Sequence, residues 1–252
     1  MEETTPAPPG KYKHYNMIIF KQFIIYIEDI DELNFNLSLT LGPTLTAGDM
    51  SYCFADCNDG IVNLAPGGEN DEDVQLGDFV CDPEKGGLYS ADPVDSSSGY
   101  ITLPNSIKEG SMPVGDKTFA LLIKHHDGAN RYAREMVQGG SWALNSEPWP
   151  KARLSVCCDW CHIGPFPDVF SKTEFVLVVM TFTATTGTMY KNGVKLGEKN
   201  CNKLPPVSEN SLWIGGYKLA ATIKSAAVWN RALSAEEVAS IDPTTLACQT
   251  TG

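Results

Sequence analysis

The chain has 252 residues, of which 42% are hydrophobic and 10% aromatic, and its formal net charge is −12. That length accommodates one large β-sandwich or two small domains, and a charged fraction of only 20% excludes a coiled coil and a disordered acidic chain. Because the 19 Lys and Arg residues form no phosphate-binding cluster and no apolar segment reaches the roughly 20 residues of a membrane-spanning helix, we expect no nucleic-acid partner and no membrane span.

Residues 1–16 are predicted to form an extended arm, because prolines at positions 6, 8 and 9 keep it out of a sheet. This arm is a candidate for self-assembly or for docking on a partner. Residues 17–252 are predicted to form a single domain. The apolar run at 17–27 is rich in β-branched and aromatic residues, so we interpret it as a strand. Acidic residues follow it in place of a small-residue cleavage site, and no signal peptide is therefore predicted.

Further strands are predicted along the chain. Residues 33–41 alternate between apolar and polar side chains, which is typical of a strand with one buried face. Residues 44–98 are rich in Gly, Asp, Asn and Pro and read as long connections. Strands follow at 100–103, 118–124, 134–138, 151–157 and 174–184, and the nearly continuous apolar run at 118–124 indicates a strand in the middle of the fold.

The last third of the chain carries sharper signals. Asn192-Gly193 predicts a tight hairpin between strands at 188–191 and 194–196, because both turn positions require positive φ. Two more strands are expected at 211–215 and 223–229. Ser234 and Glu237 have the spacing of a capping box, so a short helix is expected to start there. Leu233 and Val238 occupy the two positions of a hydrophobic staple.

Three motifs in this region resemble one family. They are Met-Tyr-Lys-Asn-Gly at 189–193, Leu-Trp-Ile-Gly at 212–215, and Ile223 followed by Trp-Asn-Arg-Ala-Leu-Ser-Ala-Glu-Glu-Val at 229–238. Together they are similar to the laminin-G-like jelly-roll domains of the concanavalin A-like lectin/glucanase superfamily. The resemblance implies an all-β fold, a two-sheet antiparallel jelly-roll sandwich with a short C-terminal helical turn.

Departures from the family pattern bear on ligand sites. Phe175 stands where the family often has Trp, Ala221 where it often has Gly, and Lys224 where it often has Asp. These changes leave the core pattern intact. They do not support the transfer of a metal or ligand site to this region.

The chain contains eight cysteines, and an even number in a loop-rich β protein suggests disulfides and an oxidising environment. All eight are predicted disulfide cysteines: Cys53, Cys57, Cys81, Cys157, Cys158, Cys161, Cys201 and Cys248. Free thiols and a zinc site are alternatives, the latter because Cys158 and Cys161 have zinc-ribbon spacing with Cys53 and Cys57 as a second pair. The expected location is extracellular or exposed on the surface of a particle.

Candidate ligand-binding residues gather in the loop-rich stretch 131–167. They are Tyr132, Trp142, Trp149, Trp160 and His162, whose aromatic faces would stack on sugar rings. The alternative is that these rings belong to the core or cover the cysteines. Calcium is a candidate cofactor because Asp92, Asp95 and Asp127 are loop carboxylates, although they form no ligand-spaced motif, and the metal ligands are unknown.

Catalysis has weak support in the sequence. Glycoside hydrolases on related folds alternate carboxylates along one strand, whereas Glu28 and Glu32 flank Ile30 at the intervening position. No nucleophile motif surrounds the four histidines. We expect no catalytic residues and a non-catalytic, lectin-like module that recognises carbohydrate or a protein surface. Two alternatives are a structural component of a larger assembly, such as a virion, cell-surface layer or filament, and a glycoside hydrolase.

Overall fold

The computed structural model describes the chain in segments, and contacts divide the chain into two units, Met1–Leu41 and Gly42–Gly252. The described residues are 15–20, 23–28, 50–55, 57, 61, 74–90, 99–103, 116–126, 133–138, 142–146, 150–156, 161–201, 212–216, 219–242 and 246–248.

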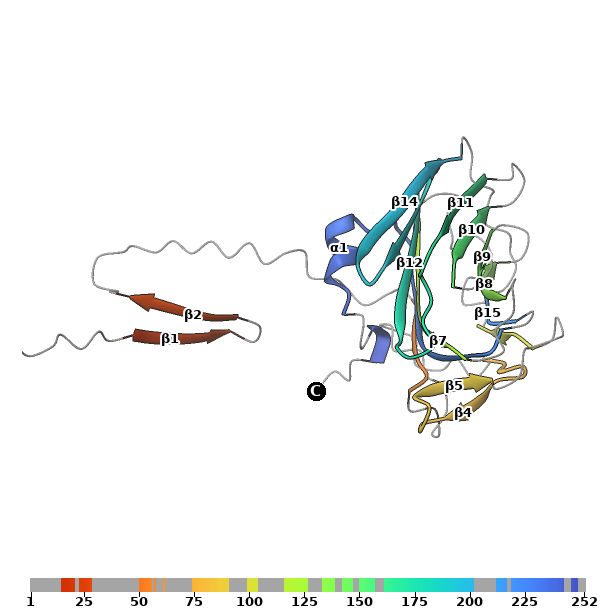
Figure 1. Cartoon of the computed structure of the whole chain (residues 1–252), viewed down its shortest axis with the longest axis horizontal. Helices are drawn as coiled ribbons and strands as arrows, with labels where there is room; N and C mark the ends of the chain where they lie inside the picture. Colours follow the sequence, from red (N-terminus) through yellow and green to blue (C-terminus); the bar gives the residue numbers. More distant parts are fainter. Residues whose placement is uncertain are drawn as a thin grey trace, which may run out of the picture. The chain divides into compact units, whose positions relative to one another are not determined.

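In the first unit, β1 (Tyr15–Phe20) and β2 (Phe23–Glu28) pair antiparallel as a two-stranded sheet of their own (Figure 1). The single strand predicted at 17–27 is therefore wrong. The polar residues Lys21 and Gln22 lie between two strands whose ends, Phe20 and Phe23, are partners in the register. The boundary predicted between the arm (1–16) and the domain (17–252) falls inside β1. The extent of the domain stays a prediction. The strand predicted at 33–41 lies outside the described residues.

The second unit contains two antiparallel sheets, which confirms the predicted fold class. The eight-stranded sheet has the order β14-β13-β12-β7-β16-β5-β4, with β3 also paired to β16; the six-stranded sheet has the order β11-β10-β9-β8-β15-β6. The first comprises β3 (Met50–Cys53), β4 (Val80–Asp82), β5 (Gly87–Ser90), β7 (Lys117–His125), β12 (Val176–Phe182), β13 (Thr186–Lys191), β14 (Val194–Asn200) and β16 (Ala221–Trp229). The second comprises β6 (Ile101–Thr102), β8 (Arg134–Gln138), β9 (Trp142–Ser146), β10 (Ala152–Val156), β11 (Cys161–Phe166) and β15 (Leu212–Ile214).

Most strands predicted after residue 100 are present, and the hairpin turn is confirmed. Lys191 and Val194 are partners in the register, with Asn192 at φ 47° and Gly193 at φ 79° between them. Five strands escaped prediction. Three of them, β3, β4 and β5, are only three or four residues long and lie in the stretch read as connections. The fourth, β9, begins with three apolar residues in succession and so lacks a clear alternation. The fifth, β11, contains Gly164-Pro165, a pair that an edge strand tolerates because one side of its backbone has no partner strand.

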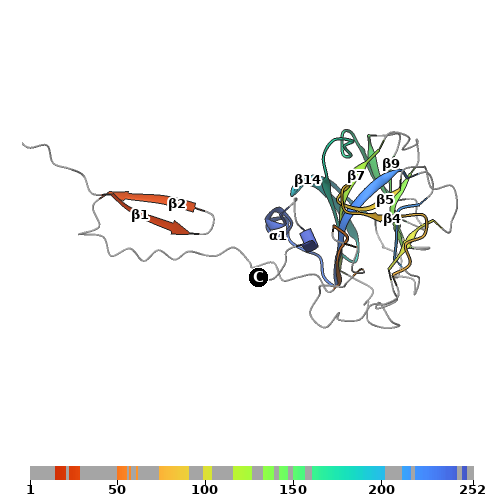
Figure 2. The same cartoon turned by 90° about the horizontal axis from the view of Figure 1, so that it is seen from below.

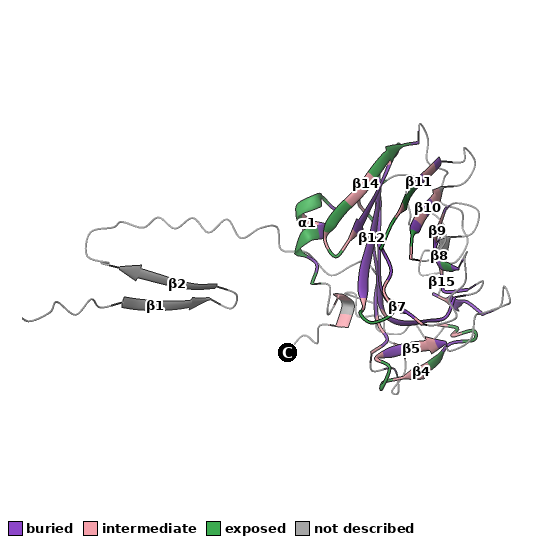
Figure 3. Ribbon diagram, in the orientation of Figure 1, coloured by how far each residue is buried: buried purple, intermediate pink, exposed green. Residues whose placement is uncertain are grey.

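The central strands β7, β12 and β16 of the eight-stranded sheet are buried on both faces. Its inner face packs against the six-stranded sheet around Phe119, Ile123 and Val178, while Leu122 and Val179 on the neighbouring positions belong to a second cluster. This explains why β7 and β12 read as continuous apolar runs and not as alternating ones. Figure 3 shows the central strand β12 buried along its length.

The C-terminal segment supplies the cover for the outer face. The helix α1 (Ala235–Ser240) lies outside the sandwich beside this sheet (Figure 2), and Leu233, Val238 and Ile241 pack into the second cluster. The predicted capping box is confirmed: the Glu237 N–H donates to Ser234 Oγ at 3.2 Å, and the Ser234 N–H donates to Glu237 Oε2 at 2.8 Å. Arg231 donates to both oxygens of the Glu237 carboxylate, and its hydrogen bonds lower the pKa of that carboxyl to about 2.

Three disulfides fix the described cysteines: Cys53–Cys248, Cys57–Cys81 and Cys161–Cys201. The first joins β3 to the 3-10 turn η1 (Leu246–Cys248) near the C-terminus. Because Cys53, Cys57 and Cys161 are oxidised, they cannot serve as zinc thiolates, and the zinc alternative built on them is wrong. Cys157 and Cys158 lie outside the described residues.

Thr118 ties the C-terminal segment to β7. Its Oγ1 donates to the Arg231 carbonyl at 2.9 Å and accepts from the Leu233 N–H at 2.9 Å. Thr118→Val keeps the shape of the side chain and leaves the buried Leu233 N–H without its acceptor. We expect the free energy of unfolding, measured by urea titration, to fall by about 1–3 kcal/mol.

Thr183→Val is the matched control, because the exposed Thr183 hydroxyl also accepts from a backbone N–H, that of Thr186, at 3.1 Å. Equal losses in both variants would show that the buried position of the Thr118 hydroxyl contributes nothing of its own.

Candidate functional site

The five predicted ligand-binding residues do not form one described cluster. Tyr132, Trp149 and Trp160 lie outside the described residues. Trp142 is on β9 with 7% of its surface exposed, and His162 is half-buried on the edge strand β11.

Trp142 occupies the interior of the sandwich. Its ring centroid lies 4.5 Å from that of Phe119 and 5.6 Å from that of Phe182, and both partners belong to strands of the opposite sheet. A buried indole in this position offers no exposed face for stacking on a sugar. The alternative reading, in which this ring is part of the core, describes Trp142 correctly.

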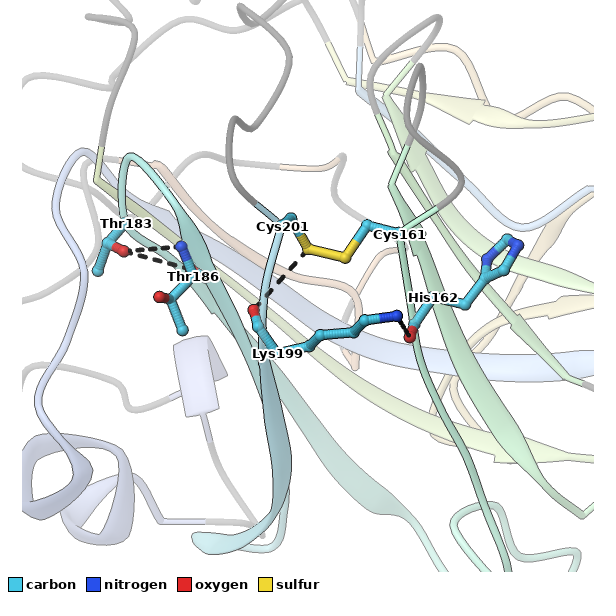
Figure 4. Close-up of a disulfide and its surroundings, with 6 residues drawn as sticks. All are labelled: Cys161, His162, Thr183, Thr186, Lys199 and Cys201. Atoms are coloured by element: carbon cyan, nitrogen blue, oxygen red, sulfur yellow. Dashed lines mark hydrogen bonds between the residues drawn. A yellow bond between two sulfur atoms is a disulfide. The ribbon is translucent and has the colours of Figure 1, made fainter.

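The neighbourhood of His162 is built by a cross-link between the two sheets. β11 and β14 are edge strands of different sheets, and Cys161–Cys201 joins the start of β11 to the residue after β14 (Figure 4). Lys199 of β14 adds a hydrogen bond from Nζ to the His162 carbonyl at 3.5 Å. Figure 4 shows the imidazole pointing away from the disulfide, so the cross-link holds the strand while the ring stands on its other side.

Strand alternation gives the six-stranded sheet a polar outer face. Along β9 and β10, Leu144 and Leu154 are buried, whereas Asn145, Arg153 and Ser155 on the alternate positions are half-buried and polar. We define the polar face by five half-buried residues on the described strands: Asn145, Arg153, Ser155, His162 and Trp213.

The register brings members of the polar face together. Ser155 is the direct partner of His162, and Arg153 is the direct partner of Asn145. The Asn145 amide donates from Nδ2 to Ser155 Oγ at 3.3 Å. An amide, a hydroxyl, a guanidinium and an imidazole therefore share one end of this face, and these are the groups that fix the orientation of a polar ligand.

Trp213 stands in the same row at the other end of the sheet. The register runs from Trp213 through Val137, Ala143 and Ser155 to His162, one residue on each of five neighbouring strands. At about 4.8 Å per strand, the row is roughly 19 Å long. The indole stacks on the ring of Tyr100, with centroids 5.5 Å apart, which fixes its orientation.

Carboxylates are scarce on this sheet. On its six described strands the only Asp or Glu is Glu135, which is fully buried, and burial raises the pKa of its carboxyl. Hydrolysis of a glycosidic bond usually requires two carboxyl groups on opposite sides of the bond. The described strands of this sheet do not provide such a pair.

The described part of the chain offers no metal cluster. Its residues contain no group of three or more His, Cys, Asp or Glu arranged to hold a metal ion. Asp92, Asp95 and Asp127, the candidate loop carboxylates for calcium, lie outside it. Among the described helices, none has the length and hydropathy to cross a membrane.

Sequence reasoning singled out His162 and missed the other members of the polar face. Part of the signal was present in residues 152–155, where apolar and polar side chains alternate. On β9 it is obscured, because Ala143 is apolar and Ser146 is polar but buried. That pattern shows which residues share a face. It does not show which strands are neighbours, so the row from Trp213 to His162 could not be assembled from it.

Trp142→Ala is expected to destabilise the fold by about 3–5 kcal/mol, because it leaves a large cavity between the two sheets. The free energy of unfolding in urea measures this loss. Trp213→Ala is the matched control, since the indole of Trp213 is half-buried on the outer face. A Trp142→Ala variant as stable as the parent protein would contradict the interior position of this ring.

The cross-link beside His162 gives a second expectation. Replacing both Cys161 and Cys201 by Ala removes a loop closure over 40 residues, for which chain entropy predicts a loss of about 4 kcal/mol. The parent protein treated with a reductant provides the comparison. Unchanged unfolding in the double variant would show that the hydrogen bond from Lys199 and the packing of β11 suffice to hold this edge.

Comparisons with known proteins agree on the architecture. Residues 95–239, more than half of the chain, match a family model described as the concanavalin A-like lectin/glucanases superfamily. No curated protein matches the chain.

Among solved structures, the botulinum neurotoxin serotype D binding domain is 13% identical with a TM-score of 0.54, over 77% of this chain and 50% of the other. The binding domain of paraclostridial mosquitocidal protein 1 is 15% identical with a TM-score of 0.52, over 77% of this chain and 51% of the other. The binding domain of botulinum neurotoxin DC, solved with rat synaptotagmin II, is 9% identical with a TM-score of 0.57, over 77% and 50%. The chain thus spans about half the length of these structures, and at such identity the likeness shows the fold.

Proposed function

The chain belongs to the concanavalin A-like lectin/glucanases superfamily, and on that premise we propose that it is a non-catalytic, lectin-like binding module whose ligand is a carbohydrate. The polar face of the six-stranded sheet carries this proposal. It combines an oriented indole at Trp213 with amide, hydroxyl, guanidinium and imidazole groups in register with one another. Aromatic rings pack on the apolar faces of sugars, and planar polar side chains bond to their hydroxyls.

The length of the row suits an extended ligand. Trp213 and His162 are separated by four strand spacings, which leaves room for several sugar units between them. Two of the residues between them in the row, Ala143 and Ser155, have short side chains. A chain of sugars lying across the strands would contact the indole at one end and the His162 side at the other.

Proteins of similar structure bind carbohydrates in some cases and a protein in another. Cell entry of botulinum neurotoxin type C depends on two ganglioside molecules, and the serotype D binding domain was solved with N-acetylneuraminic acid. The DC binding domain was solved with a protein, synaptotagmin II. These facts belong to those proteins. They support carbohydrate as the first class to test and a protein surface as the second.

The absence of an acid–base pair on the described strands of the six-stranded sheet supports a binding role over glycoside hydrolysis. Glu135 is alone there, and its buried carboxyl cannot reach a ligand on the outer face. The three disulfides support an oxidising location, extracellular or on the surface of a particle. Calcium stays a candidate cofactor of the loops.

A glycan array with the purified protein tests the proposal. We expect binding to at least one oligosaccharide class, weakened at least tenfold by Trp213→Ala, because loss of an aromatic anchor typically costs more than about 1.4 kcal/mol. His162→Ala and Asn145→Ala should weaken the same ligand. Trp160→Ala tests the remaining loop prediction.

Lys195→Ala serves as the control, because Lys195 lies on β14 of the other sheet, paired with Glu198. Binding that survives Trp213→Ala and His162→Ala would place the ligand elsewhere. A protein that binds no glycan and forms regular multimers would favour the structural alternative, whereas cleavage of the oligosaccharide would overturn the non-catalytic assignment.

A further inference from the structure

Two buried ionisable residues face one another across the sandwich. His125 ends β7 in the eight-stranded sheet, and Glu135 lies near the start of β8 in the six-stranded sheet. His125 Nε2 and Glu135 Oε1 are 3.5 Å apart, and both side chains are fully buried. A bridge at this point would tie the two sheets together.

A local irregularity places Glu135 in the interior. Met136 points into the core, so regular alternation would send its neighbour outward. The register between β8 and β9 shifts between Arg134 and Met136, which marks a bulge at Glu135. Bulges re-aim side chains, and this one directs a carboxyl towards His125.

Besides each other, these two residues have the Ser146 hydroxyl as a polar side-chain neighbour in the described part of the chain. Neither ring nitrogen of His125 and neither carboxyl oxygen of Glu135 makes a hydrogen bond of good geometry with a described residue. The nearby Ser146 hydroxyl is bonded to the backbone of Ala133. Buried polar groups normally find partners, so the contact between these two residues requires an explanation.

The surroundings leave little room for charge. The ring of Phe170 stacks on the imidazole, with centroids 4.4 Å apart. His126 and Lys172 are the positive groups that act on His125, and both disfavour a second positive charge there. Arg134, next to Glu135, is exposed. Two full charges in this interior would lose their hydration, and burial outweighs what Ser146 and nearby backbone groups offer to the Glu135 carboxylate.

We propose that His125 and Glu135 share a single proton between the two sheets, and that this pair makes the domain most stable in mildly acidic solution. The bridge is then a hydrogen bond between an uncharged carboxyl and an uncharged imidazole, and neither group carries a buried charge. The pair gains a net charge whenever the proton leaves or a second one arrives.

The directions of the two pKa shifts agree with this geometry. Burial raises the pKa of Glu135 above its ordinary value of 4.5 and lowers that of His125 from 6.5 to about 3. Ser146 and neighbouring backbone groups act on Glu135 in the opposite direction and are outweighed by burial. The folded pair therefore keeps one proton from about pH 3, where His125 would take up a second, to the raised pKa of Glu135, where the carboxyl would lose it.

Proton counting fixes the sign of the pH dependence. Between pH 4.5 and 6.5 the unfolded chain also carries one proton on these two residues, so their contribution to stability is flat. Above pH 6.5 the unfolded chain carries none and folding must take one up, so stability falls as the pH rises. Below pH 4.5 the unfolded chain carries two, so stability falls as the pH drops towards 3. Each limb changes the unfolding equilibrium about tenfold per pH unit.

Glu135→Gln and His125→Gln separate the two limbs. Urea unfolding of the disulfide-intact protein, from about pH 4 to about pH 8.5, gives the difference in stability between parent and variant at each pH. In Glu135→Gln the loss above pH 6.5 should vanish, while loss on acidification should begin already at pH 6.5. In His125→Gln the acid limb should vanish, and stability should fall from pH 4.5 upward.

The control variant replaces a carboxyl group outside the pair. Glu198→Gln removes an exposed carboxylate on β14. It should not alter the position of the maximum. A parent-to-variant difference that does not change with pH for either Glu135→Gln or His125→Gln would overturn the proposal.

A measurement on the parent protein tests the proposal even if the variants do not fold. Carbon NMR of the Glu135 carboxyl and the His125 ring follows both groups directly. We expect the carboxyl to remain protonated at pH 6 and to show no transition near 4.5. Separate, ordinary transitions near 4.5 and 6.5 would disprove a shared proton.

Discussion

The eight-stranded sheet has to be covered on both faces, and the rest of the structure follows from that requirement. Its inner face packs on the six-stranded sheet, and its outer face carries Leu122, Leu177 and Val179 into a separate cluster. The C-terminal segment covers this second cluster with α1 and the residues on either side of it. Thr118, the Arg231–Glu237 pair and the Cys53–Cys248 disulfide all act at this contact and hold the segment in place.

Because of this arrangement, the outer faces of the two sheets differ. The sheet covered by its own C-terminal segment has much of its outer face committed to packing, whereas the outer face of the six-stranded sheet carries half-buried polar groups and an indole. The second sheet is therefore the better candidate for recognition. The edge disulfide Cys161–Cys201 connects the packed sheet to the candidate recognition sheet, because it fastens the strand that bears His162 to the end of β14.

The fold could be predicted from the sequence because its strongest signals are local. Asn192-Gly193 specifies a turn by backbone conformation alone, and Ser234 with Glu237 specifies a helix start by hydrogen bonding within four residues. The candidate site depends instead on neighbours across strands, as with Trp213 and His162, and a single sequence does not order strands in a sheet. The bulge that turns Glu135 inward is a similar case, since alternation alone assigns it to the opposite face.

The Cys53–Cys248 disulfide has a consequence for the order of events during synthesis. Its two cysteines are 195 residues apart, whereas Cys57 and Cys81 are separated by only 24. As a growing chain emerges, Cys57 meets its partner early, while Cys53 waits as a thiol until almost all of the sandwich has been made. During that interval Cys53 competes with Cys57, four positions away, for Cys81. Cys53 therefore finds its native partner only when η1 has been made, and a chain that stops short of Cys248 leaves this thiol without that partner.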